Sequence, residues 1–136
     1  MDIARHVSAD TRPDQTIAIL GDAPQICFYA YRHSAATQLY VSQTMDPRPY
    51  GRQMQERMIR EIEQSKPEYL VFCCIPTSWV VQKNSSPELF DWMVRYTKQN
   101  MKMVGLIQFT GPNTVETVWG PKAADTCAFS ILHRHF

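Results

Sequence analysis

The residues best placed to do chemistry follow the first apolar segment of the chain. Residues 17–20 form an apolar run that leads into a loop at 21–25 and then into an aromatic segment. Open α/β sheets bind ligands where a strand gives way to a helix, and amides at a helix N-terminus can receive a phosphate. The loop has a single glycine, however, and the carboxylate of Asp22 would repel a phosphate. Two interpretations stand: a ligand-binding loop, or a tight turn with a helix cap.

Polar aromatic and basic residues gather shortly after this loop, at the end of the first predicted helix. They are Tyr29, Tyr31, Arg32 and His33. Such a cluster could present a stacking and hydrogen-bonding surface to a sugar or a lipid headgroup, although tyrosines on a packed helix also fill the edge of a core with the hydroxyl in water. The loop and the cluster supply our candidate ligand-binding residues, Asp22, Gln25, Tyr29 and Arg32.

Metal chemistry has one candidate, near the C-terminus. His133 and His135 lie two positions apart, which places both imidazoles on one face of a strand and permits a two-ligand site. The cation of Arg134 lies between them, and two ligands beside a cation make a poor site. We therefore expect no metal and no other cofactor.

The cysteines have neither the paired short spacing of a zinc site nor the number needed for a disulfide scaffold. They are Cys27, Cys73, Cys74 and Cys127. Cys73 and Cys74 are neighbours in an apolar run, where alternate side chains face opposite sides of a sheet. We expect ordinary buried thiols. A bridge from Cys27 to Cys73 or Cys74 is the alternative, because the first helix would pack on the central strands.

No nucleophile is paired with a base along the chain. Serine, histidine and aspartate are present, but no glycine-flanked nucleophile elbow is found. Most acids lie on amphipathic helical segments, where they are solvated, and the acids in loops are Asp22, Asp46 and Asp125. We expect no catalytic residue in this chain.

The first predicted helix is positioned by its N-terminal signals. Asp22 is a plausible N-cap, Gln25 stands three residues on as in a capping box, and Pro24 lies in the first turn, where its missing N–H costs nothing. These signals predict a helix from residue 23 to about residue 33.

Strands and helices alternate through the rest of the chain. Apolar residues at every fourth position predict a helix over 51–65, and the apolar run at 69–75 predicts a central parallel strand covered on both sides. A loop containing an exposed Trp79 precedes the next helix, which begins near Ser85 and stops at Asn100. The remaining strands are predicted at 103–109, 115–119 and 127–133, the last two as edge or antiparallel strands.

This alternation predicts an α/β fold in a single domain over residues 1–136. The sheet is expected to be mostly parallel and doubly wound, Rossmann-like or flavodoxin-like, with helices on both faces and one or two antiparallel edge strands near the C-terminus. Residues 1–15 would form an N-terminal helix and turn.

The charge balance sets two classes of partner aside. Fourteen basic and thirteen acidic residues give a formal net charge of +1, with no block of like charge to attract nucleic acid or an anionic membrane. No apolar run approaches the roughly 18 to 20 residues of a membrane helix. The N-terminal residues do not begin a signal peptide. The sequence predicts a soluble chain without a targeting signal.

The order of segments over residues 3–108 is distinctive. The strand and loop at 17–25 are followed by Tyr29 and Arg32, then by the amphipathic helix, then by residues 66–72. This order resembles the C-terminal soluble region of bacterial multi-pass membrane glycosyltransferases. These enzymes use lipid-linked sugars and are similar to protein O-mannosyltransferases (the dolichyl-phosphate-mannose-protein mannosyltransferase family) and to the aminoarabinose transferase of lipid A. In that group a hydrophilic α/β domain follows the last membrane helix.

The resemblance implies a place and a role. The helix around residues 3–7 would descend from a membrane helix of the parent protein, and the domain would lie on the extracytoplasmic, periplasmic face. The family's catalytic acids lie in a loop near the N-terminal membrane helices, to which no part of this chain corresponds. The resemblance therefore implies a non-catalytic accessory domain that recognises an acceptor or a lipid-sugar headgroup, or that assembles with the membrane-embedded portion of its parent.

Two other functions stay open on the residues alone. The chain could be a free-standing cytosolic α/β enzyme or nucleotide-binding protein that uses the loop at 21–25. It could also be a protein-interaction module, with the exposed loop of Trp79 as the contact surface.

Overall fold

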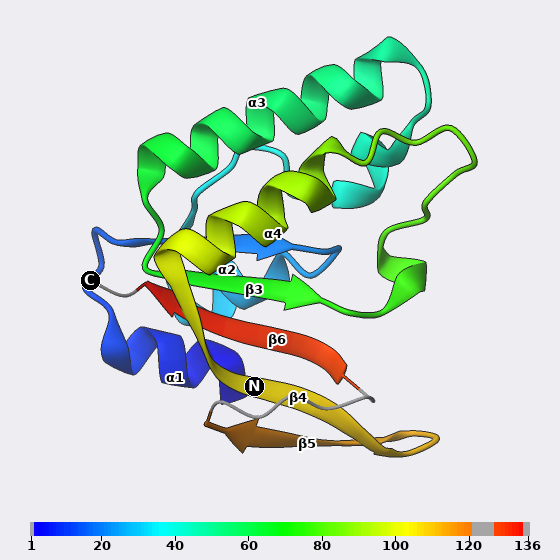
Figure 1. Cartoon of the computed structure of the whole chain (residues 1–136). Helices are drawn as coiled ribbons and strands as arrows, with labels where there is room; N and C mark the ends of the chain where they lie inside the picture. The colour runs from blue at the N-terminus through cyan, green and yellow to red at the C-terminus, as the bar shows by residue number, and fades with distance from the viewer. Residues whose placement is uncertain (1, 121–126, 135–136) are drawn as a thin grey trace.

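The structure is a computed structural model that describes residues 2–120 and 127–134 (Figure 1). This part of the chain forms six helical elements and six strands, and, within these residues, the last three strands follow one another without a helix between them. In order they are α1 (Asp2–Asp10), β1 (Thr16–Leu20), α2 (Gln25–Ala30), β2 (His33–Ser34), the 3-10 helix η1 (Val41–Met45), α3 (Pro49–Ser65), β3 (Tyr69–Cys73), the 3-10 helix η2 (Pro76–Ser78), α4 (Glu88–Asn100), β4 (Met101–Gly111), β5 (Thr114–Trp119) and β6 (Cys127–Arg134).

The strands form one six-stranded mixed sheet in the order β2-β1-β3-β6-β4-β5. β1 pairs in parallel with β2 and with β3, whereas the β3–β6, β6–β4 and β4–β5 pairings are antiparallel. The predicted doubly wound, mostly parallel sheet is therefore wrong. The fold is α/β, but the parallel arrangement is confined to the first three strands of the order.

The position of β6 explains the difference. β6 was predicted to extend an edge, yet it lies between β3 and β4 and pairs with both. Its side chains reach both layers of the fold, because Phe129 and Ile131 pack on one face and Leu132 packs on the other. Two antiparallel steps give β3 and β4 the same direction. The helix α4 thus connects two strands of equal direction that a third strand separates.

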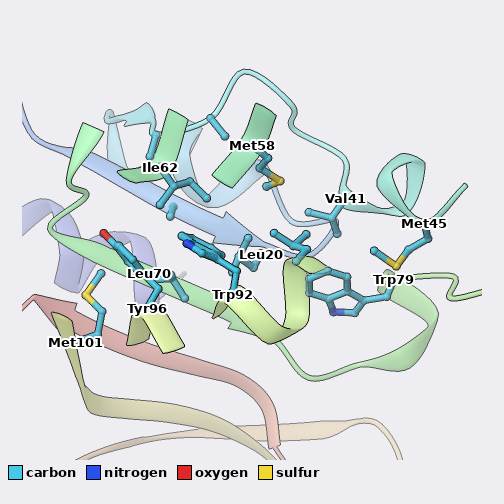
Figure 2. Close-up of a cluster of buried hydrophobic side chains, with 14 residues drawn as sticks. Leu20, Val41, Met45, Met58, Ile62, Leu70, Trp79, Trp92, Tyr96 and Met101 are labelled. Atoms are coloured by element: carbon cyan, nitrogen blue, oxygen red, sulfur yellow. The ribbon is translucent and has the colours of Figure 1, made fainter. Parts of the chain in front are cut away.

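Helices cover both faces of the sheet, as predicted. The helices α3 and α4 lie on one face, where Leu20, Leu70, Met58 and Trp92 share a core (Figure 2). The helices α1 and α2 lie on the other face, and their core joins α1 and α2 residues such as Val7 to strand residues such as Ile17 and Val71. Burying both faces of β1 and β3 accounts for their nearly continuous apolar sequence.

The helix α2 is shorter than predicted and is capped differently. It begins at Gln25 after Pro24, which makes no side-chain cap, and it ends at Ala30 because Tyr31 adopts a left-handed conformation with φ of 54°. The N–H of Tyr31 and that of Arg32 close the last turn on α2 carbonyls. The predicted capping box between Asp22 and Gln25 is absent from this part of the structure.

The loop after β3 is closed rather than exposed. Trp79 is only 3% exposed, and its indole N–H donates to the carbonyl of Cys73 at 2.8 Å. The prediction of an exposed Trp79 loop is wrong, because the indole packs between the rings of Phe72 and Phe90. Trp79 belongs to the α3 and α4 core (Figure 2).

The cysteines differ in state. Cys27 and Cys73 are free and buried, as expected of ordinary thiols. Burial raises the pKa of Cys27 to about 11. Cys74 is disulfide-bonded, so the prediction of an ordinary thiol is wrong at this position. Its partner is neither Cys27 nor Cys73, so the alternative bridge from Cys27 is wrong as well.

Within residues 2–120 and 127–134, no helix combines the length and the apolar character needed to span a bilayer.

Candidate functional site

The loop after β1 is pressed against β3. Gly21 has φ of 146°, and a Cβ atom built on it would lie 2.2 Å from the Cβ atom of Cys73. Only glycine fits such a position without a shift of the backbone. The tight-turn interpretation of this glycine is therefore confirmed.

Two amides of this loop are already used within the protein. The N–H of Asp22 donates to the hydroxyl of Ser78 at 2.6 Å, and the N–H of Ala23 donates to the carbonyl of Gly21 at 2.9 Å. The amides of Ile26 and Cys27 close the first turn of α2. A phosphate at this point would have to displace these bonds, and Pro24 offers no N–H.

The carboxylate of Asp22 caps a different helix from the one predicted. It accepts the N–H of Ser42 at 3.1 Å and so satisfies an amide in the first turn of η1. Asp22 thus links the end of β1 to the segment after β2. Gln25, by contrast, is exposed at the start of α2, and its side chain makes no hydrogen bond with the described residues.

Arg32 fastens the end of α2 to the end of α1. Its Nη2 atom donates to the carbonyls of Ser8 and Thr11 at 3.0 and 2.6 Å, and its Nε atom donates to the hydroxyl of Thr11 at 2.9 Å. Its Nη1 atom donates to the carbonyls of Ala30 and Tyr31. These carbonyls would otherwise be left without partners at the helix ends. The guanidinium of Arg32 therefore holds the structure and is not presented to a ligand.

An open groove of about 660 Å³ runs between α1 and α2 beside this anchor. Its lining is formed by Ala4, Arg5, Ser8, Ala9, Tyr29 and Tyr31. Of the four predicted ligand-binding residues, the structure brings Tyr29 into this groove and places Arg32 behind its wall. Asp22 and Gln25 lie at the other end of α2 and do not contribute to it.

The groove borders an unusual concentration of exposed aromatic rings. Phe28, Tyr29 and Tyr31 are 73%, 56% and 82% exposed, although all three come from α2 or its cap. The rings of Phe28 and Tyr29 meet edge to face with their centroids 5.4 Å apart. A non-glycine residue at positive φ is uncommon, and Tyr31 combines that conformation with an outward-facing ring. Exposed apolar surface of this kind marks interaction sites more often than isolated exposed residues do.

The chemistry of the groove is cationic and aromatic. Arg5 is exposed and makes neither an ion pair nor a hydrogen bond with the described residues. The hydroxyls of Ser8, Tyr29 and Tyr31 add donors and acceptors. An arginine beside two phenol rings suits a ligand that joins a phosphate to a ring or an apolar group.

Arg5 and Ser8 were missed by reasoning from the sequence. They stand three positions apart on α1, which places them on one side of the helix. Ile3 and Val7, on the same helix, are buried in the core. The sequence contained this spacing, but nothing in it indicated that α1 would lie against α2.

Four ionisable groups, from three separate segments of the chain, also meet where α1 ends. The Nε2 atom of His133 lies 3.1 Å from Oε1 of Glu68 and 3.6 Å from Oδ2 of Asp10. The hydroxyl of Tyr69 donates to Oδ2 of Asp10 at 2.6 Å, and burial together with this bond raises the pKa of Tyr69. This cluster anchors α1 to the sheet.

The predicted histidine pair can be placed only in part, because His135 lies outside the described residues. Among residues 2–120 and 127–134, no group of three or more histidine, cysteine or acidic side chains is arranged to hold a metal ion.

Comparisons of the chain with protein-family models, with curated proteins and with solved structures found no match.

Proposed function

We propose that this chain is a non-catalytic accessory domain of a membrane-bound glycosyltransferase, and that its α1–α2 groove receives a phosphate-bearing sugar or lipid headgroup. The observation that carries the proposal is the pairing of exposed Tyr29 and Tyr31 with the unpaired cation of Arg5 in one groove. A glycosyl or prenyl phosphate offers the matching parts: an anion for the arginine and a ring or chain for the phenol faces.

The position of the groove supports this role. It is built on α1, the first helix of the chain, and under the proposal α1 follows a membrane helix of the parent protein. The groove would then open close to the membrane surface. Tyrosine side chains suit such a position, because their rings are apolar and their hydroxyls remain in water. The partner in this arrangement is the membrane-embedded portion of the parent.

An extracytoplasmic, periplasmic location is part of the same proposal. Cys74 is disulfide-bonded, and disulfides persist mainly in oxidising compartments such as the bacterial periplasm.

The nucleotide-binding alternative has lost the site on which it rested. The amides of Asp22, Ala23, Ile26 and Cys27 donate within the protein, so a phosphate would have to displace these bonds to use them. The interaction-module alternative has likewise lost its contact, because Trp79 is buried.

A thermal-shift panel tests the proposal with the 136-residue chain. A glycosyl phosphate and a short prenyl phosphate should raise Tm, because a ligand that binds only the folded state at about 100 times its Kd stabilises it by about 2.7 kcal/mol. The Arg5→Ala variant should lose this response and keep the Tm of the unliganded protein, since Arg5 makes no hydrogen bond or ion pair with the residues that the structure describes.

The panel also contains the result that would refute the proposal. A Tm that rises with ATP or NAD and not with glycosyl or prenyl phosphates would favour the nucleotide-binding protein. If Arg5→Ala keeps the response to glycosyl phosphate, the ligand does not bind in the α1–α2 groove. Arg60→Ala serves as the matched control, because Arg60 is an exposed arginine on α3, remote from the groove.

A further inference from the structure

A second, smaller cavity lies on the other face of the sheet, between α3 and the segment that follows β2. It has a volume of about 230 Å³ and is lined by Thr37, Gln38, Tyr50, Gln53, Met54, Arg57, Met58 and Glu61. The lining residues of α3 recur at intervals of three and four positions, so they form one stripe along the helix. The cavities of drug-sized ligands measure about 300 to 1,000 Å³, so this one suits a single small ring.

The wall of this cavity is held rigidly by Glu61. Its Oε2 atom accepts the N–H of Thr37 at 2.6 Å, and its Oε1 atom accepts the hydroxyl of Thr37 at 2.9 Å. Oε1 also accepts Nε of Arg57 at 2.8 Å, in an ion pair one helical turn long. Partial burial alone would raise the pKa of Glu61, but these bonds outweigh it and lower the pKa. The carboxylate therefore fastens the segment after β2 to α3.

The same ion pair makes the cavity electrically neutral. The charge of Arg57 is compensated by Glu61, and the lining contains no other ionisable group besides the phenol of Tyr50. Nε of Arg57 and both carboxylate oxygens of Glu61 are engaged in these bonds, so the pair offers a ligand no net charge. The cavity therefore favours an uncharged ligand.

The groups left free are suited to hydroxyls. The amide N–H of Gln38 donates to the carbonyl of Tyr40 and to Gln43, so its Oε1 atom is the part left to accept. The amide of Gln53 and the hydroxyl of Tyr50 make no hydrogen bond with the described residues. The lining thus offers both donors and acceptors, which a ring bearing several hydroxyls can use.

An aromatic face and an apolar floor complete the site. Tyr50 is 60% exposed in the first turn of α3, and Met54 and Met58 lie along the same stripe. The face of a phenol ring is electron-rich, so it attracts the polarised C–H groups on the face of a pyranose. We infer that this cavity is a binding site for one neutral sugar ring, stacked on Tyr50 and hydrogen-bonded by Gln53 and Gln38.

This inference is independent of the proposed function. The helix α3, which lines the cavity, lies on one face of the sheet, whereas α1 and α2, which line the groove, lie on the other face (Figure 1). The two sites also select ligands of different charge. Neutral sugars could bind at Tyr50 even if glycosyl phosphates failed to bind at Arg5.

An NMR titration of the 136-residue chain with methyl glycosides of glucose, mannose, galactose and N-acetylglucosamine tests the inference. We expect at least one of them to cause saturable shifts with a Kd of about 1 mM, because a single ring buries little surface. The shifts should be confined to residues 37–38 and 50–61. The Tyr50→Ala variant should raise Kd by about tenfold, and Gln53→Ala should weaken binding as well.

Matched variants separate recognition from folding. Arg60→Ala, on the same helix and outside the lining, should leave the titration unchanged. Glu61→Gln removes the carboxylate charge that compensates Arg57, so it should shift the preference from neutral glycosides toward glycosyl phosphates.

Three results would overturn the inference. The first is the absence of shifts in the lining at about 50 mM of every glycoside, well above the Kd expected. The second is glycoside binding that is unchanged in Tyr50→Ala. The third is a clear preference of the cavity for nucleosides, whose flat bases could also stack on Tyr50, or for glycosyl phosphates in the wild-type chain.

Discussion

The two ends of α2 differ in how their polar groups are used. At its start, the loop after β1 is closed: Gly21 touches β3, and the N–H and carboxylate of Asp22 are both bonded within the protein. At its other end, Tyr29 and the cap residue Tyr31 face an open groove, together with Arg5 of α1. A loop at the carboxyl end of a strand can therefore bind a ligand only if its amides and side chains are not already hydrogen-bonded within the protein.

Replacing Gly21 should have the largest effect on the closed end. Gly21→Ala places a methyl group 2.2 Å from the Cβ atom of Cys73 and strains a backbone with φ of 146°. We expect a loss of about 4 kcal/mol in the free energy of unfolding, measured by urea denaturation.

The matched control for this change is Gly120→Ala. Gly120 also has a positive φ, of 123°, but a Cβ atom there meets nothing within 4 Å. It should lose about 1 kcal/mol, from backbone strain alone. Equal losses at the two glycines would show that Gly21 is not pressed against β3.

Replacing Arg32 should have the next largest effect on stability, because its side chain joins the end of α2 to the end of α1. Arg32→Ala removes donors from the carbonyls of Ser8 and Thr11, and we expect a loss of about 2 kcal/mol. Arg32→Lys should recover little, since an ammonium cannot span the same carbonyls. Full recovery by lysine would mean that the charge, and not the fork of donors, matters at this site.

Asp22 should matter less, and for stability rather than for binding. Asp22→Ala removes one cap of η1, which is worth about 1 kcal/mol. The affinity for glycosyl phosphate, measured by calorimetry, should be unchanged. A large loss of affinity in this variant would restore the loop after β1 as the binding site.

The buried thiol of Cys27 should make the stability of the protein depend on pH in the alkaline range. The pKa of Cys27 is raised from 9.0 to about 11 by burial, so the folded state keeps the proton that the unfolded state loses. The free energy of unfolding should therefore fall as pH rises from about 9 to about 11. In Cys27→Ala this part of the decline should disappear, and its persistence would show that another group is responsible.

Tyr29 should show the smallest effect on stability and still contribute to recognition. Its ring is mostly exposed, so Tyr29→Ala should change the free energy of unfolding by no more than about 0.5 kcal/mol. The same variant should weaken glycosyl phosphate binding by about tenfold. A destabilised Tyr29→Ala would place the ring in the core and close the groove.

Sequence patterns predicted individual helices and strands better than the order in which the strands pair. The spacing of Met54, Met58 and Ile62 predicted the helix that the structure places at Pro49–Ser65. The place of β6 could not be predicted, because its pairing depends on which strands leave an edge free and not on its own alternation. Local signals also misled at Asp22, where a cap for α2 was predicted and the carboxylate turned instead to Ser42, a residue brought near only by the fold.

The candidate groove was predicted in part for the same reason. Tyr29 was identified because aromatic residues cluster visibly along the sequence. Arg5 was not, since its contribution depends on α1 packing against α2. Arg32 was identified correctly as a notable residue but assigned to a ligand, because no sequence pattern shows that its donors are used by Ser8 and Thr11.

Chemical-shift mapping of the 136-residue chain titrated with a glycosyl phosphate distinguishes binding in the groove from binding at the loop after β1. We expect saturable shifts at residues 4–9 and 28–31, with residues 21–27 little affected, and the loss of these shifts in Arg5→Ala. Shifts centred on residues 21–27, or no saturable shifts in the groove, would contradict binding in the groove.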